Sequence, residues 1–171
     1  GYELSIYRAT PTVFWVGVAL ALAVAVPVVL TAAPGSLTSR ASYVLGYLAV
    51  VSTLALPLLR NYRFFGAGDS LSHMGFAHAI DAGVLDPERF LYPGVHTTGL
   101  LFEELTGIAL PRAFEFVVLL FFVVYLLFVP LCVGLLTERR LGLAVGAVAG
   151  LLLLPLNNVS VHPVVHPSSQ A

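Results

Sequence analysis

Asp69 and His73 are four residues apart, and a carboxylate and an imidazole at this spacing lie on one face of a helix. Together they can supply two ligands to a metal site that is completed by residues elsewhere in the chain. The plainer role for Asp69 is to cap the start of this helix, which we expect to run to Asp81. His78 follows five residues after His73, nearly half a turn away, and is better placed to pair with Asp81. Arg63 precedes the helix and is within reach of the Asp69 face.

The sequence around this segment is strongly apolar. Hydrophobic residues make up 58% of the chain and charged residues 10%, with a mean hydropathy of +0.95, whereas soluble chains are about 25% charged. Four runs approach the ~20 residues that cross a hydrocarbon core: Val13–Ala33, Ala41–Leu59, Phe116–Leu136 and Leu141–Leu156. None of these runs contains Asp, Glu, Arg or His, which disfavours a proton-coupled transporter. We therefore expect an all-α, multi-pass helix bundle in the cell membrane.

Residues 1–171 are expected to form a single transmembrane domain. Because the chain starts at Gly1 rather than Met and ends in the polar residues Ser168–Ala171, we expect it to be the N-terminal fragment of a longer protein. Four crossings place residues 61–112 and all five histidines on one side of the membrane. The short turns on the other side carry Arg40, Arg139 and Arg140, so the positive-inside rule places the long loop outside the cytoplasm. The net charge is −1 and no basic stripe is present, so nucleic acid is not an expected partner.

Glycine and proline indicate how the expected helices pack. Gly142, Gly146 and Gly150 recur every four residues, which allows a neighbouring helix backbone to approach closely. Pro27 and Pro130 lie inside apolar runs, where each removes a backbone N–H and bends its helix unless a neighbour satisfies the freed carbonyl. We expect close helix contacts near the glycines and bends at the prolines.

Two short amphipathic helices are expected in the extracytoplasmic loop 61–112. The first covers Asp69–Asp81 and stops near Gly83, and the second covers Thr97–Thr106 and ends at Gly107. The apolar side of the second helix consists of three leucines: Leu100, Leu101 and Leu105. Such helices between membrane spans are typical of elements that lie at the membrane interface.

Two segments of this loop, GDSLSHMGFAHAIDAGVLDPERF and YPGVHTTGLLFEELTGI, resemble the first large external loop of the GT-C superfamily of polytopic glycosyltransferases. The similarity is closest to archaeal members and covers roughly residues 41–112. It implies transfer of a sugar from a polyprenyl-phosphate-linked donor to an acceptor outside the cytoplasm. The expected partners are then membrane lipid, the polyprenyl-phosphate sugar and the sugar acceptor.

The resemblance also implies roles for five residues. Asp69 matches the family's catalytic carboxylate, which takes a proton from the acceptor or helps to hold a divalent metal, and His73 would orient Asp69 or share its proton. Arg63 and Arg89 are candidates for the donor phosphate, because a guanidinium fork suits phosphate oxygens. Lipid headgroups are the plainer contacts for both arginines. His96 would approach the same cavity, with capping of the second helix as its plainer role.

The cofactor stays open, and so does the function class. Family members often carry a second acidic residue next to the first or two positions after it, where this chain has Ser70 and Leu71, which weighs against two carboxylates bridging a divalent metal. A lipid or sugar transporter or flippase is the first alternative, and a non-catalytic membrane scaffold is the second. Convergence of Asp69, His73 and His96 on one cavity would favour the enzyme, whereas scattered side chains would favour the scaffold.

Overall fold

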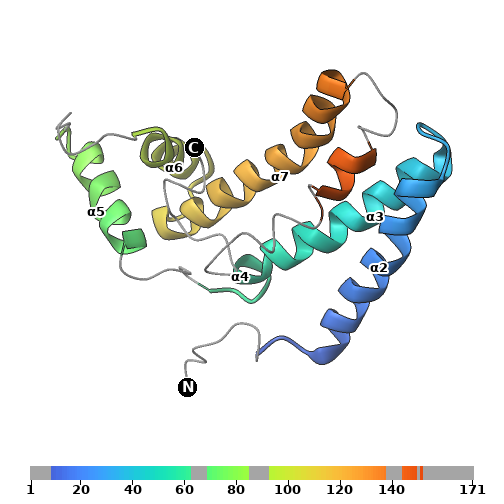
Figure 1. Cartoon of the computed structure of the whole chain (residues 1–171). Helices are drawn as coiled ribbons and strands as arrows, with labels where there is room; N and C mark the ends of the chain where they lie inside the picture. Colours follow the sequence, from blue (N-terminus) through green and yellow to red (C-terminus); the bar gives the residue numbers. More distant parts are fainter. Residues whose placement is uncertain (1–8, 63–68, 85–92, 138–143, 150, 152–171) are drawn as a thin grey trace. The chain divides into compact units, whose positions relative to one another are not determined.

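The computed structural model describes residues 9–62, 69–84, 93–137, 144–149 and 151, with backbone alone at 69, 70 and 137. Every regular element within these ranges is a helix, as expected (Figure 1). The described residues separate into two compact units: unit 1 holds those up to Leu56 and from Val123 onward, and unit 2 holds Pro57–Phe122. In chain order the helices are α2 (Thr12–Thr31), α3 (Leu37–Leu54), α4 (Leu56–Leu59), α5 (Asp69–Asp81), α6 (Pro93–Thr106) and α7 (Leu110–Thr137).

In unit 1, α2 and α3 form a hairpin around a tight turn (Figure 1). Gly35 has a φ of 78°, which favours a residue without a Cβ, and the side chain of Ser36 caps α3 by accepting a hydrogen bond from the Ser39 N–H at 3.2 Å. The two helices approach closely at Gly46, where an added Cβ would lie 3.2 Å from the Cβ of Ala25. Small residues on both helices permit this approach.

The proline in α7 has a specific partner in α3. Pro130 has no N–H, so the carbonyl of Leu126, four residues earlier, lacks its usual helical donor. The hydroxyl of Tyr43 donates a hydrogen bond to that carbonyl. The expectation that a neighbouring helix can satisfy the carbonyl freed by Pro130 is therefore confirmed, and the bond ties α3 to the C-terminal part of α7.

The expected span Ala41–Leu59 is not one continuous helix. α3 ends at Leu54, Ala55 lies outside the helices, and the four-residue α4 begins at Leu56. The physical reason is Pro57, which has no N–H to continue the α3 hydrogen-bond pattern and whose ring crowds the preceding turn. α3 also begins four residues earlier than expected and includes Arg40 in its first turn.

Among the helices of the described ranges, α2 and α7 are long and apolar enough to cross a membrane. Only 11% of the α2 span and 28% of the α7 span are buried against the rest of the chain, so most of their residues are at least partly accessible. α7 begins six residues before the expected Phe116 and therefore includes two ionisable residues, Arg112 and Glu115. The predicted run Phe116–Leu136 itself contains no Asp, Glu, Arg or His, and both charged residues lie in the earlier part of α7.

The fourth expected span, Leu141–Leu156, is described only at residues 144–149 and 151, which are helical. Gly146 lies against α7: an added Cβ would be 2.8 Å from the Cβ of Val133 and 3.1 Å from the Cα of Pro130. This is the close backbone approach that the glycine spacing predicts. The other two glycines of that pattern, Gly142 and Gly150, lie outside the described residues.

Unit 2 contains α5, α6 and the start of α7. α5 covers the residues expected for the first loop helix and is followed by Gly83, which has a φ of 78°. α6 begins at Pro93, four residues before the expected start, and ends at Thr106 before Gly107, which has a φ of 70°. Both glycines adopt the left-handed conformation that commonly terminates helices. α5 packs against α6, and this contact positions the candidate site.

Candidate functional site

A pair of buried histidines joins α5 to α6. The Nδ1 atom of His73 lies 2.9 Å from the Nε2 atom of His96, a hydrogen-bond distance between residues 23 positions apart in the chain. His73 is 8% exposed and His96 is 2% exposed. Two of the five residues that the sequence placed in one site are therefore in direct contact.

Aromatic rings surround the histidine pair. Phe76, one turn after His73 on α5, meets both imidazoles edge to face, with ring centroids 5.5 Å from His73 and 6.0 Å from His96. Phe114 of α7 meets His96 in the same manner at 6.4 Å and is fully buried. The hydrogen bond between the imidazoles thus lies among apolar rings, where it is stronger than it would be in water.

Gly99 brings α6 close to this aromatic wall. A Cβ at position 99 would lie 3.1 Å from a ring carbon of Phe114, so a larger residue would require the Phe114 ring to shift. Val95, His96 and Gly99 form the buried side of α6. Leu101 and Leu105, assigned to its apolar side from the sequence, are 54% and 75% exposed.

Two charged side chains fix the start of α7 through hydrogen bonds to backbone groups. The backbone N–H of Leu110 donates to Glu103 Oε1 at 2.9 Å, so a carboxylate from α6 caps α7. The Arg112 guanidinium donates to the carbonyl oxygens of Tyr62 at 2.6 Å and Leu58 at 3.2 Å. These contacts hold α6, α7 and the end of α4 together. They also position Phe114, which lies near the start of α7 and contacts His96.

The geometry of the pair limits its protonation. One imidazole nitrogen must donate and the other must accept, and a doubly protonated imidazolium has no acceptor nitrogen. The hydrogen-bonded pair therefore carries at most one positive charge. Such an arrangement can accept one proton and pass it between two rings, which is the chemistry of an acid–base relay.

The described residues offer no preformed metal site. Within those ranges, no group of three or more His, Cys, Asp or Glu side chains is gathered closely enough to hold a metal ion. His73 Nδ1 and His96 Nε2 are directed at each other rather than at a shared ion. The sequence-based metal expectation depends on Asp69, whose side chain lies outside the description.

The remaining predicted residues are placed only in part. Asp69 is the first residue of α5, one helical turn before His73. Arg63 and Arg89 lie outside the described residues. His78 is exposed on α5 while His73 is buried, which agrees with the prediction that these two histidines lie on different faces.

Two charged residues with structural importance were not singled out from the sequence. Arg112 binds backbone carbonyls, and Glu115 is a carboxylate only 5% exposed on α7. Both precede Phe116, the first residue of the predicted apolar run. The sequence signal for both residues is their position just before a long apolar run. A charged residue in the first turns of such a helix requires a partner when it is buried.

Comparison with known proteins gives no match to a protein-family model, to a curated protein or to a solved structure.

Proposed function

We propose that this chain is part of a membrane-embedded glycosyltransferase of the GT-C type, which moves a sugar from a polyprenyl-phosphate donor to an acceptor outside the cytoplasm. The observation that carries the proposal is the contact between His73 and His96. Both residues belong to the segments that resemble the family's external loop, and a buried, polar pair with room for one shared proton suits acid–base chemistry. In a scaffold, the same pair would serve only to hold α5 against α6.

The proposed reaction is a displacement at the anomeric carbon of the sugar. The acceptor hydroxyl forms a bond to that carbon, the bond between the carbon and the phosphate oxygen breaks, and polyprenyl phosphate leaves with the bonding electrons. Asp69 takes the proton of the acceptor hydroxyl. His73, one turn along the same helix, orients the carboxylate, and His96 holds His73 in the required tautomer.

Arg63 and Arg89 are proposed to bind the donor phosphate, where a guanidinium would stabilise the negative charge that develops on the leaving group. A divalent cation bound with the help of Asp69 would supply the same stabilisation. Ser70 and Leu71 stand where family members often carry a second acidic residue, which weighs against a bridging divalent cation. The arginines are therefore the proposed source of positive charge.

The proposed site requires a multi-pass arrangement. The outward-facing apolar surface of α2 and α7 supports spans that contact lipid, because soluble monomers rarely expose large contiguous apolar surfaces. α3 with α4 and the helix containing residues 144–149 are proposed as the other two crossings. The loop 61–112 then lies outside the cytoplasm, with α5 and α6 at the membrane interface, where a lipid-linked donor is within reach.

The proposal is tested by sugar transfer with the intact protein in membranes supplied with polyprenyl-phosphate sugars. Asp69→Asn preserves shape and removes the base, so transfer should fall by about 10²–10⁴-fold, the usual contribution of a general base. Asp81→Asn is the matched control, since it makes the same change at the exposed end of the same helix and should retain full activity.

Thermal unfolding of both variants separates catalysis from folding, and each should unfold within a few degrees of the wild type. Full activity of Asp69→Asn would remove Asp69 from the mechanism. Absence of transfer by folded wild-type protein, across several donor sugars, would reject the enzyme and favour a transporter or a scaffold.

A further inference from the structure

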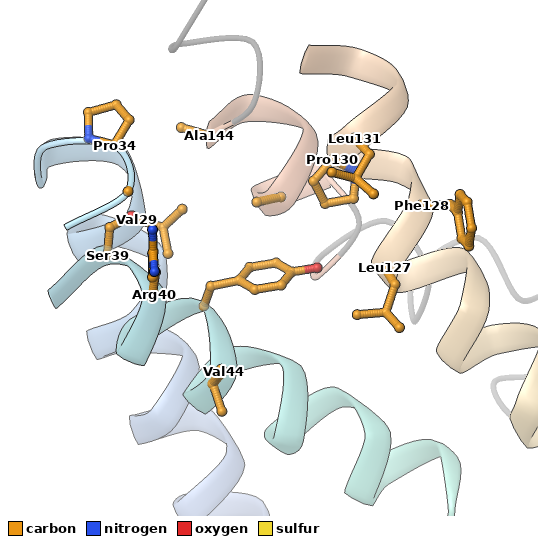
Figure 2. A pocket seen from close by; sticks show the side chains of 13 residues that line it. Val29, Pro34, Ser39, Arg40, Val44, Leu127, Phe128, Pro130, Leu131 and Ala144 are labelled. Carbon is orange, nitrogen blue, oxygen red and sulfur yellow. The ribbon is translucent and has the colours of Figure 1, made fainter. Parts of the chain in front are cut away.

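Unit 1 contains an apolar cavity of about 750 Å³ between α2, α3 and α7 (Figure 2). Its size lies within the range of about 300–1,000 Å³ that is typical of small-molecule sites. Val44, Phe128 and Leu131 line it and are 52–58% exposed, so the described residues leave part of its hydrocarbon walls uncovered. Figure 2 shows Phe128 and Leu131 on the α7 wall, across the cavity from the α2–α3 turn.

Arg40 provides the positive charge at this cavity. It lines the cavity beside Ser39 and close to Pro34, and its Nη2 atom lies 4.0 Å from the position of a Cβ on Gly35, over the α2–α3 turn (Figure 2). Arg40 is exposed, and no carboxylate of the described residues pairs with it. A guanidinium at one end of an apolar cavity matches a molecule with an anionic head and a hydrocarbon tail.

We infer that this cavity binds an anionic phospholipid of the membrane leaflet that faces the α2–α3 turn. The phosphate is held by Arg40 with the Ser39 hydroxyl beside it, and one hydrocarbon chain lies along Val44, Leu127 and Leu131. Basic pockets between membrane helices on the cytoplasmic side are typical sites for such headgroups. The inference requires the chain to lie in a membrane, but it does not require glycosyl transfer.

A second cavity in unit 1 provides an internal comparison. It has a volume of about 360 Å³, lies between α2 and α3, and is lined by residues that include Val13, Leu45 and Leu48. No charged residue lines it. Lipid chains that contact this second cavity should therefore show no preference for an anionic headgroup, in contrast to those beside Arg40.

The test is a titration of the purified intact protein, in neutral detergent, with phosphatidylglycerol or phosphatidylcholine, followed by native mass spectrometry of the bound lipid. Arg40→Gln should weaken phosphatidylglycerol binding by about fivefold, equivalent to about 1 kcal/mol, and leave phosphatidylcholine binding unchanged. Arg60→Gln, which removes an exposed arginine that does not line the cavity, should leave both affinities unchanged.

Filling the cavity tests the tail site separately. Val44→Trp should reduce phosphatidylglycerol binding, and Leu48→Trp, on the same helix but at the second cavity, should not. Thermal unfolding of each variant, compared with the wild type, establishes that the bundle is intact. If Val44→Trp does not fold, Leu131→Trp provides the same test from α7.

Unchanged phosphatidylglycerol affinity in Arg40→Gln, or an equal loss in Arg60→Gln, would overturn the inference. Displacement of the lipid by soluble glycerol 3-phosphate at equal concentration would also overturn it, because the headgroup alone would then account for binding. Loss of lipid binding together with normal sugar transfer would support this site and leave the proposed catalytic site unaffected.

Discussion

Polar side chains are used differently in the two compact units. In unit 1, the Tyr43 hydroxyl bonds a backbone carbonyl that Pro130 has freed, and glycines let helices approach closely. In unit 2, the imidazoles of His73 and His96 bond each other. A polar group that satisfies backbone supports a fold, whereas two titratable side chains held together can move a proton. The described polar contacts of unit 1 thus serve the packing of its helices, whereas unit 2 holds the titratable pair on which the proposed function rests.

The largest effect is expected from disrupting the helix contact in unit 1. Gly46→Leu would place a Cβ 2.9 Å from a methyl group of Leu151 and 3.2 Å from the Cβ of Ala25, so α2 and α3 must separate. We expect a loss of about 3 kcal/mol in the free energy of unfolding, at the upper end for overpacking. Unfolding in detergent micelles measures it. Gly17→Leu is the control, since a Cβ at Gly17 meets nothing within 4 Å; equal losses in both variants would contradict the packing argument.

An intermediate effect is expected from separating the histidine pair. His96→Leu removes the hydrogen bond to His73 Nδ1 in a buried setting, at a cost of about 1–2 kcal/mol. His78→Leu, at an exposed position on α5, should change stability by less than about 0.5 kcal/mol. Chemical unfolding of both variants provides the comparison. If His96→Leu were as stable as the wild type, the pair would not contribute to holding α5 against α6.

The smallest effect is expected at the proline of α7. Tyr43→Phe removes the hydroxyl that bonds the Leu126 carbonyl and should cost about 0.6–1 kcal/mol, the usual size for hydrogen bonds between membrane helices. Tyr47→Phe is the control on the same helix. Pro130→Ala restores a backbone N–H, so in that background Tyr43→Phe should become neutral. A double-mutant cycle measured by thermal unfolding checks this. An equal cost of Tyr43→Phe with and without Pro130 would contradict the role assigned to the Tyr43 hydroxyl.

Local signals in the sequence predicted the helices of unit 2 well. Asp69 marks the start of α5 and Gly83 follows its end, and Gly107 marks the end of α6. These are signals that act within a few residues. The predicted start of α6 lies four residues late because Pro93 is the first residue of the helix, a position that proline tolerates.

Interactions between distant residues were harder to predict. The contact between His73 and His96 depends on how α5 packs against α6, which residue spacing does not determine. Hydropathy does not predict the break after Leu54, because a hydropathy scale takes no account of the backbone N–H that Pro57 lacks. Hydropathy does not predict the early start of α7, because Arg112 in its first turn is charged. In the structure, the Arg112 guanidinium donates hydrogen bonds to the carbonyl oxygens of Tyr62 and Leu58.

The bond between Tyr43 and the Leu126 carbonyl has a consequence for how this protein evolves. Tyr43 is useful at its position because Pro130 has left a carbonyl unsatisfied, and Pro130 is tolerable in α7 because Tyr43 is there. The two residues are 87 positions apart, yet through this bond the effect of substituting one should depend on the identity of the other. Among descendants of this sequence, loss of the proline should relax the requirement for tyrosine, so that the two positions covary.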